Sequence, residues 1–356
     1  MKLSTVYKLF LLASASAPNF ARKNNRGVTI IELIVGMVIA GILIQLAYFA
    51  FSVNREMYLK DAAKNDTNQN LKTVFEVVGP AITQAGEGVG VDSSFPVISI
   101  EPFPTSSDNS KLTVRQLKVS TKLRICQDLA AGAQTSITVL TSDLAAPAGC
   151  VPVDGNGDNY PDDWLEWRSY RQSNGGTLRI YIYDGSGRLE PLNYTGEKVY
   201  DASGAAITGT PSANQVASAS IDVTGTLANA YTAGGATRLI IVEERTYQLN
   251  GNTLQTIIDS GSPINLINNV GQFTVRAAVR QGSTVSQCTR LLPQTSSFTC
   301  SPTLAETYNW SQIDGIEVTS KPSLASNTPG LSTTNIDNIN SRIQTQIFYP
   351  RNLINF

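Results

Sequence analysis

One acidic side chain stands inside the most apolar segment of the chain. From Val28 to Val53 the sequence reads VTIIELIVGMVIAGILIQLAYFAFSV, and Glu32 is its only charged residue. As a helix this segment is long enough to cross a bilayer, because about 20 apolar residues suffice. A carboxylate at the bilayer centre costs on the order of 2.5–3.5 kcal/mol and marks a function by default. The alternative is that Glu32 lies at the level of the lipid headgroups and has no special role.

The sequence contains no histidine, which excludes Ser-His-Asp and Cys-His catalysis and His-ligated zinc. No Walker A, dinucleotide-binding GxGxxG or GxSxG motif is present. A membrane-tethered carboxylate enzyme would need acids that converge in a cleft. We therefore predict no enzyme and no catalytic residue. The formal net charge of −1 gives no attraction to a polyanion, so we predict no direct binding to nucleic acid.

The first 27 residues form a basic leader on an acidic body. They hold five Lys or Arg residues and no acid. Because positive flanks stay in the cytoplasm, we expect a cytoplasmic N-terminus and an exported body. A rival reading takes Tyr7–Ala17 (YKLFLLASASA) as a short secretion signal. Its apolar core, Leu9–Ala13, is shorter than the usual 7–15 residues.

Arg26–Leu33 (RGVTIIEL) closely resembles the processing motif of type IV prepilins, in which a basic leader ends in Gly. The resemblance implies that prepilin peptidase cuts between Gly27 and Val28 and that the new amine of Val28 is methylated. It also implies that Glu32 pairs with the amine of a neighbouring subunit during assembly. Val28 departs from the Phe that is usual at this position.

The resemblance further implies the domain organisation, the partners and the location. Residues 1–27 are the removed leader, 28–53 the transmembrane helix, 54–90 its amphipathic continuation and 91–356 a globular head. The expected partners are other pilins and minor pilins, prepilin peptidase and an inner-membrane assembly platform. The expected location is the inner membrane, with the head in the periplasm, and then a cell-surface pilus.

The body of the chain predicts an α+β fold, with the long helix packed on an antiparallel, β-rich head. Leu71, Val74, Phe75 and Val78 form one helical stripe, and the helix is expected to end near Ala85. Candidate strands are Leu112–Val119, Leu178–Tyr183, Arg238–Leu249, Thr253–Ile258, Phe273–Val279 and Ile313–Val318, with a hairpin turn at Asn250-Gly251. Flexible insertions are predicted near 202–237 and 321–337.

Within the pilin superfamily the head most resembles PilW-like minor pilins. The resemblance rests on Gln84-Ala85-Gly86, on the segments Asn269–Val279 and Trp310–Val318, and on Gln346–Asn352. It implies a minor pilin that initiates or caps a type IV pilus and supports motility, adhesion or DNA uptake. The alternative is a J-type pseudopilin of a type II secretion system.

Four cysteines, at 126, 150, 288 and 300, form no CxxC motif. Sequence proximity predicts the disulfides Cys126–Cys150 and Cys288–Cys300, one of three connectivities. The alternative, four buried thiols, applies to a reducing compartment.

The densest acidic cluster, DGNGDNYPDDW at 154–164, is similar to extracellular calcium loops. Its oxygen ligands would be Asp154, Asn156, Asp158, Asp162 and the carbonyl of Tyr160. Asn159 replaces the glycine of loop position 6, and Leu165 stands where a glutamate would close the shell. The alternative is a polar turn that leads into a strand over Trp164–Tyr170.

Overall fold

The computed structural model describes residues 29–89, 95–102, 109–140, 154–185, 188–233, 237–292, 299–301, 310–326, 328–329 and 331–351. The chain divides between Tyr58 and Leu59 into two compact units. The described part of the first unit is the N-terminal half of one helix. The second unit contains the rest of this helix and every described strand.

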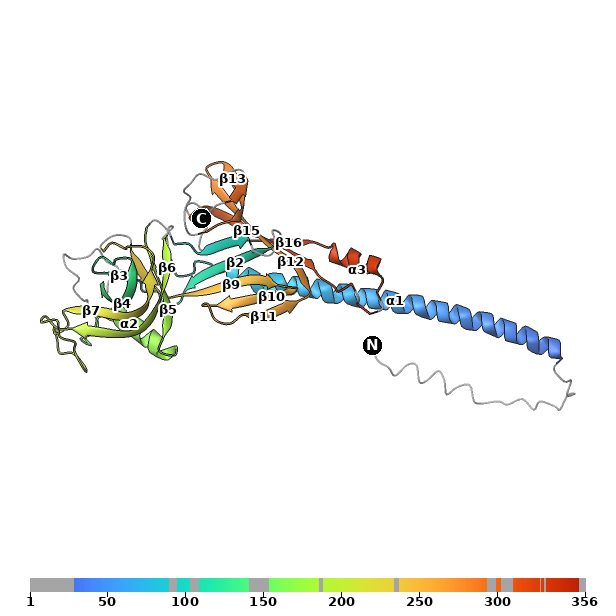
Figure 1. Ribbon diagram of the computed structural model, residues 1–356, viewed down its shortest axis with the longest axis horizontal. Coiled ribbons are helices and arrows are strands. Elements are labelled where there is room, and N and C mark those ends of the chain that lie inside the picture. The colour runs from blue at the N-terminus through green and yellow to red at the C-terminus, as the bar shows by residue number, and fades with distance from the viewer. Residues whose placement is uncertain are drawn as a thin grey trace. The chain divides into compact units, whose positions relative to one another are not determined.

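Helix α1 runs from Ile30 to Thr83 as one element of 54 residues (Figure 1). In the second unit its buried face includes Leu71, Val74, Phe75 and Val78, which confirms the predicted stripe. Past the helix, Gly86 and Gly88 take φ angles of 75° and 78°, a conformation that only glycine adopts at little cost. The helix therefore ends close to where the sequence predicts.

Two five-stranded antiparallel sheets pack with α1 around a shared hydrophobic core. The first has the order β1 (Ile98–Pro102), β2 (Ser110–Leu117), β9 (Val242–Asn250), β10 (Thr253–Ile258) and β11 (Ile264–Asn268). The second has the order β14 (Thr299–Ser301), β13 (Thr284–Arg290), β12 (Val270–Gln281), β15 (Ile313–Pro322) and β16 (Gln344–Phe348), with η1 (Trp310–Gln312) before β15. The predicted hairpin is confirmed, because Asn250 pairs with Thr253 across the turn.

The remaining six strands close into a barrel with its own hydrophobic core. Around the barrel their order is β3 (Leu123–Ile125), β4 (Gly132–Leu140), β7 (Ser218–Leu227), β6 (Leu189–Tyr200), β5 (Leu178–Tyr183) and β8 (Arg238–Ile240). The sequence analysis did not predict this barrel. The α+β class is confirmed, and the described part of the head contains two hydrophobic cores.

The barrel is an insertion between two neighbouring strands of the first sheet. Leu117 at the end of β2 pairs with Val242 at the start of β9, and the amide of Lys118 donates to the carbonyl of Ile241 at 2.9 Å. The chain thus leaves the sheet and returns to it at adjacent positions. Predicted as one strand, Arg238–Leu249 is divided at Ile241, with β8 in the barrel and β9 in the sheet.

Helix α2 (Asp162–Ser173) replaces the strand considered over Trp164–Tyr170, so that alternative was wrong. Both residues of the first turn that precede Trp164 are acidic, which suits the positive end of a helix dipole. Trp164 and Trp167, three positions apart, lie on one helical face and are both buried. Their indole nitrogens donate to the carbonyls of Ser220 and Thr121, each at 3.0 Å. Their spacing of three is the signal in the sequence that favours a helix over a strand here.

A buried ion pair holds α2 against the barrel. Arg171 contacts both carboxylate oxygens of Glu197, with Nε at 2.8 Å and Nη2 at 2.9 Å. The hydroxyl of Tyr194 donates to the same carboxylate at 2.9 Å. The Glu197 side chain is only 5% exposed, so its charge depends on these partners.

The two segments predicted as flexible insertions each contain some regular structure. In 202–237, β7 buries Ala219, Ile221 and Val223 at alternating positions among its polar residues. In 321–337, β15 extends to Pro322 and α3 (Thr333–Asn340) begins after the N-cap Ser332, whose hydroxyl accepts from the amide of Asn335 at 3.3 Å. Composition outweighed a correct period-two signal in the first case.

Candidate functional site

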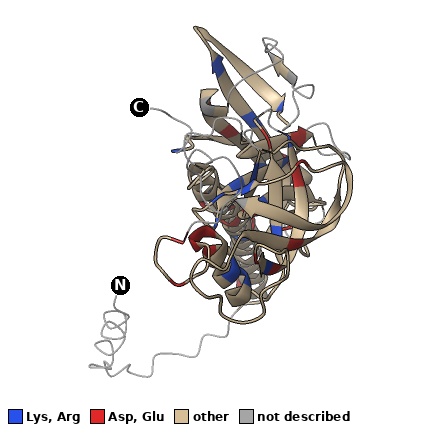
Figure 2. Ribbon diagram, turned by 90° about the vertical axis from the view of Figure 1, so that its left-hand side faces the viewer, with Lys and Arg blue, Asp and Glu red and all other residues tan. Residues whose placement is uncertain are grey.

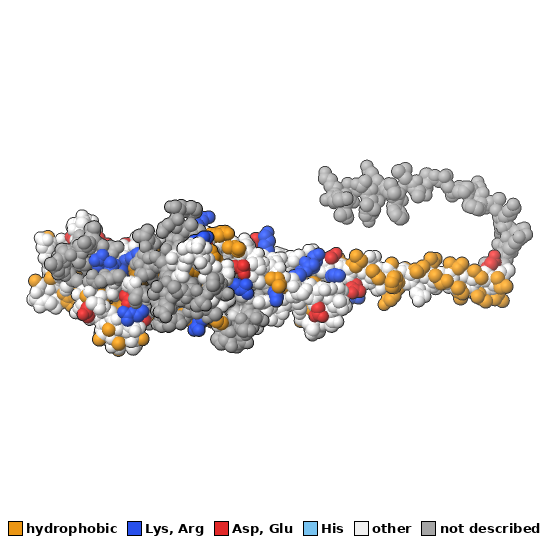
Figure 3. All heavy atoms as spheres, turned by 90° about the horizontal axis from the view of Figure 1, so that it is seen from above, with side chains coloured by type: hydrophobic (Ala, Val, Ile, Leu, Met, Phe, Trp, Pro, Cys, Tyr) orange, Lys and Arg blue, Asp and Glu red, His pale blue; other side chains and the backbone are white. Residues whose placement is uncertain are grey.

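The apolar half of α1 presents its side chains to the outside along its length. The large apolar residues between Ile30 and Tyr58 are 41–80% exposed. An 18-residue window in this helix has a mean hydropathy of 2.5 and is not buried at all. Figure 3 shows apolar atoms covering this part of the chain on the face in view. From Ile30 to Val53 the helix would span about 36 Å at 1.5 Å per residue, which exceeds the ~30 Å hydrocarbon core.

Glu32 caps the start of this helix together with Thr29. The Glu32 Oε2 atom accepts from the backbone amide of Thr29 at 3.1 Å and from its hydroxyl at 3.2 Å. In return the amide of Glu32 donates to the Thr29 hydroxyl oxygen at 3.3 Å. This reciprocal pattern is a capping box, which satisfies two donors that a helix N-terminus leaves unpaired. The sequence spacing Thr-x-x-Glu carried this signal, and the sequence analysis did not use it.

The capping box fixes where the helix begins relative to the predicted processing residues. Gly27 and Val28 lie outside the described residues, and helical structure starts at Ile30, directly after Thr29. The Glu32 carboxylate has about four lone-pair positions, so it can accept a further donor while it caps its own helix. Its charge also suits the positive end of the helix dipole.

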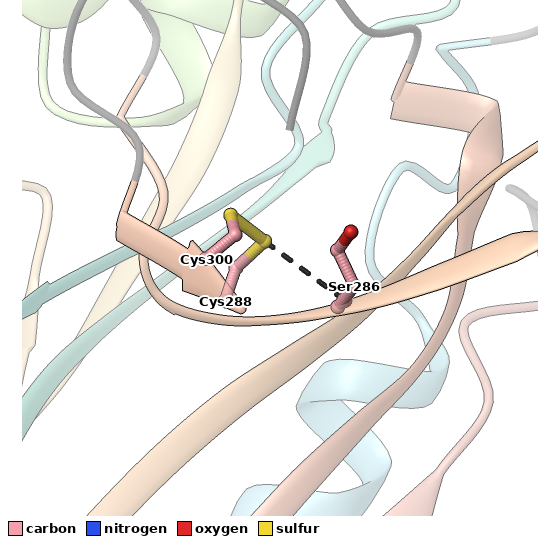
Figure 4. Close-up of a disulfide and its surroundings, with 3 residues drawn as sticks. All are labelled: Ser286, Cys288 and Cys300. Atoms are coloured by element: carbon pink, nitrogen blue, oxygen red, sulfur yellow. Dashed lines mark hydrogen bonds between the residues drawn. A yellow bond between two sulfur atoms is a disulfide. The ribbon is translucent and has the colours of Figure 1, made fainter. Parts of the chain in front are cut away.

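The structure joins Cys288 and Cys300, as the sequence predicts. These residues face each other on β13 and β14, with their Cα atoms 4.0 Å apart (Figure 4). The Sγ atom of Cys288 lies 4.0 Å from the carbonyl oxygen of Ser286, a van der Waals contact because a disulfide sulfur carries no hydrogen. Cys126 is disulfide-bonded too, and its predicted partner Cys150 lies outside the described residues.

The predicted calcium loop folds around its own acidic side chains. Asp154 accepts the amides of Gly157 and Asn159 at 2.7 and 2.8 Å, and Asp162 accepts that of Gly155 at 2.9 Å. Asn159, at the position that favours glycine, has a φ of 69°.

Asn156 and Asp158 accept loop amides in the same way, from Asp158 and Tyr160, each at 2.9 Å. The Asp162 Oδ1 atom is buried and has no hydrogen-bond partner among the described residues. Over the same residues no group of three acidic or thiol side chains is close enough to hold a metal ion. Calcium binding at this loop stays a prediction.

Comparison with known proteins finds one family and one solved structure. Residues 22–47 match the family model for the prokaryotic N-terminal methylation motif. No curated protein matches the chain. A type IV-like pilin from Thermus thermophilus is 12% identical over 54% of this chain and 97% of its own, but the TM-score of 0.15 gives this match no weight.

The matched motif ends inside the exposed apolar half of α1 and contains the Thr29–Glu32 capping box. The chain is type IV pilin-like: it combines a prepilin-type N-terminus with a long apolar helix and a strand-rich head. This combination defines a structural protein and not an enzyme, and it implies processing by prepilin peptidase and association with other pilins.

Proposed function

We propose that the chain is a minor pilin of a type IV pilus that initiates or caps the filament. The observation that carries the proposal is the apolar, outward-facing helix that begins with a Thr29–Glu32 cap inside the methylation motif. Such a large apolar surface is unfavourable in water, so lipid or other helices must cover it. A membrane span before assembly and a helical filament core after it would cover it in turn.

Cleavage after Gly27 would leave the amine of Val28 one residue before the N-cap. A positive charge is unfavourable at a helix N-terminus, where the peptide dipoles already present a partial positive charge. The Glu32 carboxylate offsets that charge on its own helix and offers an acceptor to the amine of a neighbouring subunit. In low dielectric this pairing would set the register between subunits more than it would add stability.

The head supports a role for the chain at low copy number. The barrel, residues 123–240, adds a second core to the head, and its Tyr181, Tyr183 and Ile240 also pack into the core of α1 and the two sheets. A second folded body on every subunit would hinder close lateral packing along a tube. The late segments that resemble PilW-like heads are paired here, since β12 and β15 align Val275 with Val318. We infer that the chain sits near a filament end, in the periplasm first and then at the cell surface.

The proposal is tested by mass spectrometry of filaments sheared from the natural host. The wild-type chain is expected in the sheared fraction at low abundance relative to the main subunit. The variant Glu32→Gln should remain in the membrane and be lost from that fraction, because it removes the charge but keeps the shape of the cap.

Glu76→Gln is the matched control, since it makes the same change on the same helix. Glu76 forms an exposed pair with Lys72 at 3.5 Å, an arrangement worth only ~0.3–0.5 kcal/mol. This variant should assemble normally. A wild-type chain that is absent from sheared pili, together with a loss of protein secretion on deletion, would contradict the proposal and support the J-type pseudopilin.

A further inference from the structure

A cleft of about 540 Å³ opens in the second unit at the junction between the first sheet and the barrel. One wall contains Lys118, Glu243 and the buried Ile241, next to the two points where the chain crosses between the cores. The lining also includes Thr177, directly before β5, and Arg179 on β5. Its volume lies within the ~300–1,000 Å³ range of small-molecule sites.

Two basic and two acidic residues line this cleft, Lys118 and Arg179 against Glu243 and Asp259, so its formal charges balance. Lys118 Nζ contacts Glu243 Oε2 at 2.5 Å, and Arg245 contacts the other oxygen of Glu243. Arg179 donates to the hydroxyl of Tyr181 at 2.8 Å and to that of Ser260 at 2.5 Å. Figure 2 shows acidic and basic residues interspersed along the ribbon in this view. The cleft therefore favours a ligand without a strong net charge.

Uncharged polar groups line the cleft and are available to a ligand. The side chains of Thr177 and Asn193 and the hydroxyl of Tyr170 make no hydrogen bond to the described part of the chain. Thr177 and Asn193 are exposed, and the Tyr170 ring is half-buried at the end of α2. Ile241 and Val242, each 2% exposed, add an apolar floor.

The rim of the cleft is a tight turn. Asp259 and Ser260, which join β10 to β11, have φ angles of 49° and 62°, and the amide of Gly261 donates to the carbonyl of Ile258 at 2.8 Å, as in a type I′ hairpin turn. The amide of Glu244 holds this turn by donating to Asp259 Oδ1 at 2.8 Å. Burial raises the pKa of the Asp259 carboxyl, which lines the cleft.

We propose that this cleft binds a short neutral saccharide. Amide and hydroxyl groups can donate and accept toward sugar hydroxyls, and the Tyr170 ring offers an apolar face to the C–H side of a sugar ring. Balanced charges explain why the ligand would be neutral. The cleft contains no residue of α1, so the test of saccharide binding is independent of the test of prepilin processing.

The experiment is saturation-transfer NMR on the full chain in lipid nanodiscs, which avoids sugar-based detergents. The probes are the methyl glycosides of glucose, galactose, mannose and N-acetylglucosamine. At least one is expected to receive saturation on its ring protons. Asn193→Ala and Thr177→Ala should each weaken binding about fivefold, the loss of one neutral hydrogen bond. The exposed Asn338, on α3 and away from the cleft, gives the control variant Asn338→Ala, which should bind as wild type does.

Thr177 directly precedes β5 and Asn193 lies on β6, so either correctly folded variant decides the question, and near-UV circular dichroism establishes the fold. Saturation transfer that both variants reduce supports the saccharide cleft. The absence of transfer to all four glycosides would overturn the proposal. Transfer that is unchanged in a folded variant would overturn it as well, because the sugar would then bind elsewhere.

Discussion

Gly79→Ala is expected to destabilise the second unit because the ring of Phe348 occupies the space of a side chain at this position. A Cβ atom at Gly79 would lie 2.2 Å from Phe348 Cε1 and less than 3 Å from two further ring atoms. The ring would have to leave its place on α1, next to Phe75 at a centroid distance of 6.4 Å. Strand β16 would lose its contact with the helix.

The size of the effect follows from three terms for Gly79→Ala. Alanine favours a helix over glycine by ~1 kcal/mol. Against this, forced overpacking costs ~1–3 kcal/mol, and exposing an aromatic ring costs ~1.5–3 kcal/mol when its burial is complete. Phe348 is only partly buried, so we expect a net loss of about 1–2 kcal/mol. The substitution also places a side chain before Pro80, which adds strain of its own.

Hydrogen exchange measured by mass spectrometry on β15–β16 peptides tests this prediction. A loss of ~1.4 kcal/mol corresponds to roughly tenfold faster exchange. A double-mutant cycle compares Gly79→Ala in the wild-type chain and in Phe348→Ala. The strain at Pro80 is the same in both backgrounds and cancels. Alanine at 79 should cost at least ~1 kcal/mol less once the ring is absent. Equal costs in the two backgrounds would refute the steric explanation.

Three further predictions follow from the second unit. Glu197→Ala should cost ~3–5 kcal/mol, because it leaves Arg171 buried without its partner; thermal unfolding should show a lower Tm, and a change below ~1 kcal/mol would contradict a structural ion pair. Replacement of 119–240 by Asn-Gly should leave the first sheet and α1 folded but less stable, since the amide of Lys118 already bonds to Ile241 while Tyr181, Tyr183 and Ile240 are lost from their core; complete loss of exchange protection over 71–82 would show that the barrel is needed for that core. Calcium is expected to raise the Tm of the wild-type chain but not that of Asp162→Asn, and an equal or absent rise in both would remove the predicted ion site.

The sequence predicts best those elements whose signal is local. Two strands, Leu178–Tyr183 and Thr253–Ile258, have their predicted bounds, because β-branched and aromatic residues lie between clear turn residues. The stripe on α1 is also local, since it repeats along one helix. The disulfide between Cys288 and Cys300 follows from proximity in sequence and from pairing of adjacent strands.

The barrel could not be predicted because its closure depends on distant pairings. β3 pairs with β8, so Leu123 meets Leu239 across more than a hundred residues. No local pattern specifies such a contact. The polar composition around β7 also hid its alternating buried positions. The Thr29–Glu32 capping box is a different case, because its spacing was visible in the sequence and only its geometry showed that Glu32 caps its own helix.

The central claim is that the N-terminus is processed as in a type IV prepilin. Intact mass and N-terminal sequencing of the chain from membranes of its host, with and without prepilin peptidase, test it most directly. The account predicts a mature chain that begins at methylated Val28, and an uncut chain that retains Met1 when the peptidase is missing. A chain that starts near Ala17 or Pro18, or one that keeps Met1 in the presence of the peptidase, would contradict it.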